Sequence, residues 1–375
     1  MPTALALGRA RSDLDVFSRA GLALNDFLAE ATTALDRVVP FAGGCVATLD
    51  PATSMVSGVL KLGALRGRND LDVAWSQIEY GRDDPSALAH LVAAGRSAVG
   101  IHNEYRGEVE RSVRMAELII PHFDFRDEGR VVLADRSGAW GALALFRSRG
   151  DAPFDEDELD FLAEVAPAFT RGIRAGLLVQ LSRAEAAAAA GPAVIVVDAS
   201  ERVVQATPSA QEHLDLLSGP MQGDPLTFVH SLVTAARRFA RGVSDRVPRT
   251  RIRTPDGRWL VVHASPLSGD GDRSGDVVVT IEEARPQEVV ALVASAFGLT
   301  ARERDVTAMV LSGADTKEIA AAMHVSPYTV QDHLKSIFDK AGVTSRRELV
   351  ARVYFDQYAP RIGQAVGADG WFVGD

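Results

Sequence analysis

Apolar residues recur at three- and four-residue intervals between Leu299 and Val353, and this spacing predicts four short amphipathic helices. The apolar positions of the four helices are, in order, Val306, Met309 and Val310; Ile319, Ala320 and Met323; Val330, Leu334, Ile337 and Phe338; and Leu349, Val350 and Val353. Each set lies on one face of its helix, so we expect the four helices to pack together around a small apolar core.

Each of these helices also has local start or stop signals. Thr300 and Glu303 form a capping box at the first helix, because each side chain can bond the backbone N–H of the other residue. The other signals are Gly313 after the first helix, Asp315 or Thr316 before the second, Ser326 and Pro327 before the third, Gly342 after it, and Thr344 or Ser345 before the fourth. The second and third helices, joined at His324 and Val325, therefore form a helix-turn-helix, a unit that places one helix in the DNA major groove.

The polar face of the third helix carries the residue types that read bases. Glutamine can bond adenine, lysine can reach guanine, and aspartate can accept a hydrogen bond from cytosine. Hydroxyl, lysine and arginine side chains at the starts of the second and fourth helices suit DNA phosphates. The predicted DNA-binding residues are Thr316, Lys317, Ser326, Tyr328, Thr329, Gln331, Asp332, His333, Lys335, Arg346 and Arg347.

The charge of this segment also allows a plainer interpretation, a four-helix fragment with a solvated polar face. Residues 297–358 contain eight Lys or Arg and eight Asp or Glu, whereas nonspecific DNA-binding proteins usually carry a positive excess. The basic residues are unevenly placed, however. Lys335, Lys340, Arg346 and Arg347 all lie on the third helix or just after it, which favours DNA binding over the plainer interpretation.

Residues 299–353 resemble the DNA-binding domain of LuxR/NarL-type transcription regulators. The motifs that carry the resemblance are L-T-x-R-E, K-E-I-A, V-S-x-x-T-V, H-L-K-S-I, K-A-G-V and R-R-E-L-V. The resemblance implies four helices, insertion of the third into the major groove, and binding as a dimer. It also implies that Gln331, Asp332 and Lys335 read bases. The family usually has lysine where Gln331 stands, and Asp332 adds a negative charge, so the operator sequence stays open.

The residues from about 13 to 180 alternate between helical and strand patterns. One amphipathic helix is expected around Val16, Leu22, Phe27, Leu28 and Leu35. Strands are expected at 44–49, 55–60, 130–134 and 139–146, a helix at 86–94, a tight hairpin at 135–138, and a long helix from Asp155 towards Ala190. Trp140–Leu145, Pro153–Asp155 and Leu159–Leu162 resemble the end of a GAF domain. That resemblance implies an antiparallel sheet beside a cup that can hold a small ligand.

Residues 192–284 show a second mixed pattern. Strands are expected at 193–197, 202–206, 249–254, 259–265 and 276–282, with one helix after Thr207 that carries Leu214 and Leu217. This order of a strand pair, a short helix and a three-strand meander resembles a PAS domain, as do the stretches around Asp198 and Trp259. The family's sheet often cups a small molecule and also makes dimer contacts. His213, His230 and His263 are candidate haem ligands, but lone histidines are usually structural or solvated.

Composition narrows the class of protein. The 375 residues exceed one ordinary domain, and the formal net charge of −10 confines any contact with nucleic acid to a local surface. The single cysteine, Cys45, excludes a disulfide framework and is expected to act as a small buried hydrophobe. No apolar run approaches the ~20 residues that cross a bilayer, and no secretory signal is expected. We therefore expect a soluble, cytoplasmic protein that makes no membrane contact.

The sequence thus predicts a multidomain α+β protein in which two antiparallel-sheet sensor domains precede an all-α helix-turn-helix domain. The expected parts are a GAF-like domain at 13–181, a linker at 182–191, a PAS-like domain at 192–284, a linker at 285–296, the DNA-binding domain at 297–358 and a tail at 359–375. No metal site or cofactor is identified, and the ligand of the sensor domains is unknown.

The expected function is signal-controlled, sequence-specific binding of double-stranded DNA by a homodimer, with RNA polymerase as a further candidate partner. The segments 155–190 and 286–296 are expected to carry the signal. Two alternatives stay open. In one, a protein partner controls the same DNA-binding output without a small ligand. In the other, the sensor region is an enzyme that the DNA-binding domain localises, although the sequence contains no phosphate loop, nucleophile elbow or H-E-x-x-H pair.

Overall fold

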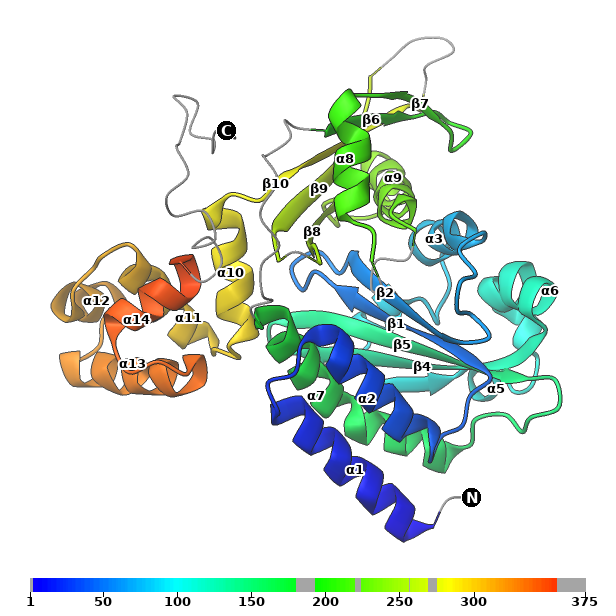
Figure 1. Ribbon diagram of the computed structural model, residues 1–375, viewed down its shortest axis with the longest axis horizontal. Coiled ribbons are helices and arrows are strands. Elements are labelled where there is room, and N and C mark those ends of the chain that lie inside the picture. Colours follow the sequence, from blue (N-terminus) through cyan, green and yellow to red (C-terminus); the bar gives the residue numbers. More distant parts are fainter. Residues whose placement is uncertain (1–2, 180–192, 220–223, 256, 269–274, 356–375) are drawn as a thin grey trace. The chain divides into compact units, whose positions relative to one another are not determined.

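A computed structural model describes residues 3–179, 193–219, 224–255, 257–268 and 275–355, and the chain forms two compact units (Figure 1). The first unit contains two antiparallel sheets and comprises residues 1–179, 190–255 and 259–283. The second contains the helices that follow residue 284. The predicted linker at 182–191 and the predicted tail at 359–375 lie outside the described residues.

The first sheet has five strands in the order β2-β1-β5-β4-β3, and every neighbouring pair is antiparallel. The strands are β1 (Gly43–Leu49), β2 (Val56–Gly63), β3 (Ala98–Gly100), β4 (Phe125–Asp135) and β5 (Gly138–Ser148). The hairpin between β4 and β5 is confirmed: Gly138 has a φ of 131°, which favours glycine, and the Ser137 N–H donates to the carboxylate of Asp135. The sequence did not predict β3, which is only three residues long.

Three helices lie on one side of this sheet (Figure 1): α1 (Ala4–Arg19), α2 (Leu24–Asp36) and α7 (Glu156–Leu178). Helix α7 packs on β3, β4 and β5, and α1 and α2 pack on α7 and on each other. The predicted acidic start of α7 is a capping box formed by Asp155 and Glu158. The prediction of one helix through Val16 and Leu35 was wrong. The chain forms two helices because Gly21 takes a φ of 67° between them, and Val16 is exposed rather than buried.

Four shorter helices lie in the chain between β2 and β4: α3 (Asp72–Gly81), α4 (Leu88–Ala93), α5 (Ile101–Glu104) and α6 (Ile120–Phe123). Helix α4 falls within the predicted range 86–94, whereas α3 was not predicted. A buried ionic cluster lies in the same region, in which Arg114 contacts Glu79 and Glu128 at 3.2 and 2.9 Å. Its members are far apart in sequence, so no local pattern indicates it.

The second sheet has the strand order β7-β6-β10-β9-β8, which is the same pattern of connections as in the first sheet. Its strands are β6 (Ala193–Val197), β7 (Val203–Ala206), β8 (Arg249–Arg253), β9 (Trp259–Pro266) and β10 (Val277–Glu283). Between β7 and β8 lie α8 (Pro208–Leu216), as expected, and the longer α9 (Leu226–Ala240), which was not predicted. Helix α9 packs on β9 and β10 with Phe228, Val229, Leu232 and Val233 buried.

The two sheets belong to one unit because buried contacts join them. The carboxylate of Asp50, just after β1, accepts hydrogen bonds from Arg251 on β8 at 2.7 and 2.6 Å. Their side chains are 2% and 9% exposed, so water screens this pair very little. The Thr250 hydroxyl also donates to the Val56 carbonyl, and one apolar core continues from the first sheet into the second.

The second unit is a helical bundle: α10 (Pro286–Ala296), α11 (Ala301–Leu311), α12 (Thr316–Met323), α13 (Pro327–Ala341) and α14 (Arg346–Val350). The predicted core is confirmed, since Val306, Ile319, Val330, Ile337 and Leu349 have no exposed surface. The segment predicted as a linker at 285–296 is the helix α10, and it packs on α11 with Val289 and Val293 buried. Within the described residues, no helix is both long and apolar enough to cross a membrane.

Candidate functional site

Helix α13 is amphipathic, with one buried apolar side and one exposed polar side. Val330, Leu334 and Ile337 are buried, and Gly342 ends the helix in the left-handed conformation. The opposite side presents Tyr328, Gln331, Asp332 and Lys335, all exposed, with Tyr328 at 73%. Spacings of three and four residues connect them, so they form one stripe along the helix. We call them the α13 stripe.

The start of α13 is fixed by its cap. The Ser326 hydroxyl accepts the Thr329 N–H at 3.1 Å and contacts the Thr329 hydroxyl at 2.9 Å, and Pro327 occupies the first helical turn. Two of the predicted DNA-binding hydroxyl groups are therefore engaged with each other. His333 is half-buried beside the stripe.

The predicted phosphate contacts differ in their exposure. Lys317 and Arg347 are exposed at the starts of α12 and α14. Arg346 is half-buried, and its guanidinium donates to the Ala314 carbonyl and, at 3.4 Å, to the Thr316 hydroxyl. Arg346 therefore holds the loop before α12 in place.

Glu303 caps α11, as the sequence predicted, and also bonds to two side chains of α13. Besides accepting the Thr300 N–H at 2.7 Å, its carboxylate accepts hydrogen bonds from Ser336 at 2.7 Å and from Lys340 at 2.6 Å. Burial opposes ionisation of this 6% exposed side chain, but the bonds from Lys340, Thr300 and Ser336 outweigh it and lower its pKa to about 2. Lys340, which the sequence placed in the basic cluster, is an exposed residue whose ammonium group is thus paired with Glu303.

This pairing predicts how the helical unit responds to acid. The folded pKa of Glu303 lies below its ordinary value of 4.5, so the stabilisation is complete above about pH 4.5 and is lost as the pH falls towards about 2. We expect Glu303→Gln to destabilise the unit by about 3 kcal/mol at pH 7, the value of a shift of this size. Glu318→Gln, at the exposed capping box of α12, should cost about 1 kcal/mol or less.

Hydrogen exchange of α11 and α13 in the full chain, followed at pH 7 and pH 3, measures both effects. The Glu303→Gln substitution should remove most of the acid sensitivity of these amides. Equal protection in wild type and Glu303→Gln at pH 7, or an acid response that survives the substitution, would contradict this role of Glu303.

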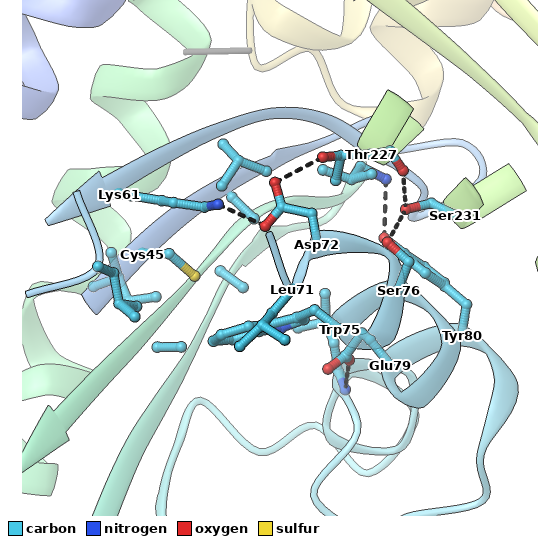
Figure 2. Close-up of a pocket in the computed structure, with 18 of the residues that line it drawn as sticks. Cys45, Lys61, Leu71, Asp72, Trp75, Ser76, Glu79, Tyr80, Thr227 and Ser231 are labelled. Atoms are coloured by element: carbon cyan, nitrogen blue, oxygen red, sulfur yellow. Dashed lines mark hydrogen bonds and ion pairs between the residues drawn. The ribbon is translucent and has the colours of Figure 1, made fainter. Parts of the chain in front are cut away.

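The first unit contains a cavity of about 90 Å³ between its first sheet and α3 (Figure 2). Strands β1, β2 and β5 supply mostly apolar walls, and α3 supplies Trp75 and Tyr80. Two hydroxyl-bearing residues of α9, Thr227 and Ser231, also line it. None of these lining residues was marked as a site by the sequence, because strands and helices that are distant along the chain bring them together.

Ion pairs are set into the wall of this cavity. The ammonium group of Lys61 donates to Asp72 at 2.5 Å, to the Asn69 side chain at 2.8 Å and to the Arg68 carbonyl at 2.5 Å. These three bonds use all the donors of a lysine, so Lys61 holds the loop that leads into α3. Burial raises the pKa of Asp72 even though Lys61 and Thr227 bond to it.

Cys45 also lines the cavity, from β1. It is half-buried, and burial, together with the nearby charge of Glu128, raises the pKa of its thiol to about 12. The group is therefore a neutral thiol at physiological pH, which agrees with the small hydrophobe expected from the sequence.

The helical unit matches known proteins. Residues 298–353 match the family model of bacterial regulatory proteins, luxR family. The monoamine regulon transcriptional regulator of Klebsiella aerogenes is 46% identical over 56 residues, which are 15% of this chain and 25% of that protein. The probable transcriptional regulatory protein NarL of Mycobacterium tuberculosis is 32% identical over 99 residues, which are 23% of this chain and 46% of that protein.

These matches and the geometry of α12 and α13 identify the helical unit as a helix-turn-helix DNA-binding domain. Residues 298–353 are a domain of the luxR family. The chain spans a quarter or less of the length of the first curated relatives that it matches.

Similarity to solved structures is weaker. The GAF domain of an Acinetobacter phosphoenolpyruvate-protein phosphotransferase has a TM-score of 0.29 and 15% identity, over 46% of this chain and 94% of that one. A Vibrio cholera VqmA–ligand–DNA complex has a TM-score of 0.22 and 18% identity, over 46% of this chain and 88% of that one. Neither similarity is close enough to support a conclusion about function.

Proposed function

We propose that this protein is a sequence-specific, DNA-binding transcription regulator that reads bases with the α13 stripe. The observation that carries the proposal is the exposed line of Tyr328, Gln331, Asp332 and Lys335 on the second helix of a luxR-family helix-turn-helix. Both ends of α13 are capped and its apolar side packs in the core. These contacts hold the side chains of the stripe in one orientation for contact with base pairs. Lys317 and Arg347 supply phosphate contacts beside it.

In this proposal the protein binds as a homodimer, and its two recognition helices occupy half-sites about one helical turn apart. The GAF-like segment at 13–181 and the PAS-like segment at 192–284 form the input. The cavity beneath α3 supports a small molecule, rather than a protein partner alone, as the signal. RNA polymerase stays a candidate partner of the DNA-bound dimer.

Selection of the full chain against a pool of random duplexes tests the proposal. The expected result is enrichment of a paired motif, two half-sites separated by about 10 base pairs. A pool that shows no enrichment over many rounds would refute sequence-specific binding by this chain.

On the enriched duplex, we expect Lys335→Ala to weaken binding by ~1–3 kcal/mol, because a lost base contact costs about that amount. The same substitution should weaken binding to a scrambled duplex less, because loss of a base contact affects only the enriched sequence. Loss of a phosphate contact would weaken binding to the two duplexes equally. Arg302→Ala removes one exposed positive charge outside α13 and serves as the matched control. Gel-shift isotherms on both duplexes provide the comparison, and an equal loss on both would remove Lys335 from the base-reading set.

A further inference from the structure

The first unit contains two modules, one around each sheet: residues 3–179 form the first module and residues 193–283 the second. Residues of both modules line the cavity beneath α3. Its floor comes from strands of the first sheet, and its remaining wall includes Thr227 and Ser231, which belong to α9 of the second module (Figure 2). Helix α3 lies between the two, since it both lines the cavity and packs along α9. An occupant of the cavity therefore touches residues of both modules.

Two hydrogen-bonded pairs connect α3 with α9 at the cavity wall. The Thr227 hydroxyl donates to the carboxylate of Asp72 at 2.9 Å, and the hydroxyls of Ser76 and Ser231 are 2.9 Å apart. At the far end of α3, Arg238 donates to the Gly81 carbonyl at 2.8 Å. A side chain at Gly81 would come within 2.9 Å of Thr234, so the two helices are in close contact there.

The charges along the wall are already balanced. Among the described lining residues, Lys61 pairs with Asp72 at 2.5 Å, Glu79 pairs with Arg130 at 2.9 Å, and Arg68 at the edge pairs with Asp70 at 3.1 Å. A charged ligand would lose its hydration without meeting an unpaired opposite charge, which is unfavourable. The wall therefore selects an uncharged molecule.

The size of the cavity limits that molecule. Its volume is about 90 Å³, whereas an engineered cavity of about 150 Å³ in another protein holds benzene. By that scale the occupant has roughly four non-hydrogen atoms. The apolar walls favour a hydrocarbon body, and the hydroxyls of Ser76, Thr227 and Ser231 favour one hydrogen-bonding group.

We propose that this cavity binds a compact, uncharged, mainly apolar molecule and that the second module detects its presence through α3. The inference rests on the proposed function in treating the first unit as the input. Insertion of the ligand displaces α3, and the pairs Asp72–Thr227 and Ser76–Ser231 pass the displacement to α9.

Cys45 offers a way to fill the cavity after the chain has folded. It is the single cysteine of the sequence and lines the cavity. With methyl methanethiosulfonate, its thiolate attacks the thiomethyl sulfur, a methyl disulfide forms and methanesulfinate leaves. Alkaline buffer offsets the raised pKa of the thiol, and Cys45→Ala treated in the same way controls for effects of the reagent elsewhere.

Hydrogen exchange of the full chain then reports on both helices. We expect methylthiolation to change exchange in α3 and α9 by roughly fivefold or more, the scale of a typical coupling between sites. In Thr227→Val/Ser231→Ala, α3 should still respond while α9 should not. An unchanged α9 in the methylthiolated wild-type chain, or an α9 response that survives the double substitution, overturns the proposed coupling.

A matched pair of small molecules tests the ligand class. 2-Propanol and isopropylammonium have nearly the same shape, four non-hydrogen atoms each, and differ in charge. We expect ligand-observed NMR to show binding of 2-propanol to the full chain, loss of that binding after methylthiolation of Cys45, and no binding of isopropylammonium. Binding of isopropylammonium, or no binding of 2-propanol, overturns the assignment. Since none of these measurements uses DNA, their failure is distinguishable from failure of the duplex selection.

Discussion

Replacement of Val330 by aspartate is expected to unfold the helical unit and to abolish DNA binding. Val330 has no exposed surface and lies on the side of α13 opposite the stripe. A carboxylate there would be buried without a partner, which costs several kcal/mol and exceeds the stability that such a small unit can lose. Hydrogen exchange in the full chain should show the amides of α11, α12 and α13 losing protection, while both sheets keep theirs.

The matched control places the same charge on an exposed position of the same bundle. Ala322 is exposed on α12, so Ala322→Asp should cost under about 1 kcal/mol and leave the unit folded. Normal protection of α13 in the Val330→Asp chain would mean that position 330 faces solvent and that α13 is rotated about its axis. The stripe would then be the wrong set of residues.

The second large effect is expected at the junction of the two sheets. Asp50→Asn should destabilise the first unit by about 3–5 kcal/mol, because Arg251 would keep its buried charge and lose the carboxylate that balances it. The exposed pair of Arg68 and Asp70 provides the control, and Asp70→Asn should leave the stability of the first unit nearly unchanged.

Denaturant unfolding followed by hydrogen exchange at β1 and β9 measures this effect in both modules. We expect the two strands to lose stability together in Asp50→Asn. The double substitution Asp50→Leu/Arg251→Met should recover much of the loss, since an apolar pair can replace a buried ion pair. A loss confined to β1 would show that the modules are stabilised independently.

The sequence was most informative where the interactions are local. Capping residues and apolar spacing located α11 to α14 within a residue or two, because a helix of this kind is determined by contacts three and four residues apart. Most strands of both sheets were also found, since they alternate or form short apolar runs between turn residues. The candidate DNA-binding stripe follows directly from the phase of α13, which makes it predictable from sequence.

Local patterns could not indicate features that depend on distant parts of the chain. Helix α9 is buried by the second sheet, and every residue from Phe228 to Ala236 is buried, so its sequence lacks a polar face. A local start signal was nevertheless present and missed, since the Asp224 carboxylate accepts the Leu226 N–H at 2.9 Å. The cavity joins residues from β1, α3 and α9, and its Ser76–Ser231 contact spans 155 positions of the sequence. Lys340 was placed among the basic residues that favour DNA binding because its partner, Glu303, precedes it by 37 residues.

The measurement that tests the central claim most directly is a parallel selection of random duplexes by the full wild-type chain and by Gln331→Lys. Gln331 lies in the middle of the α13 stripe and is exposed. If the stripe reads base pairs, the two chains should enrich motifs that differ at one or two positions in each half-site, with guanine gained where lysine replaces glutamine. Identical enriched motifs would contradict base reading by this face of α13.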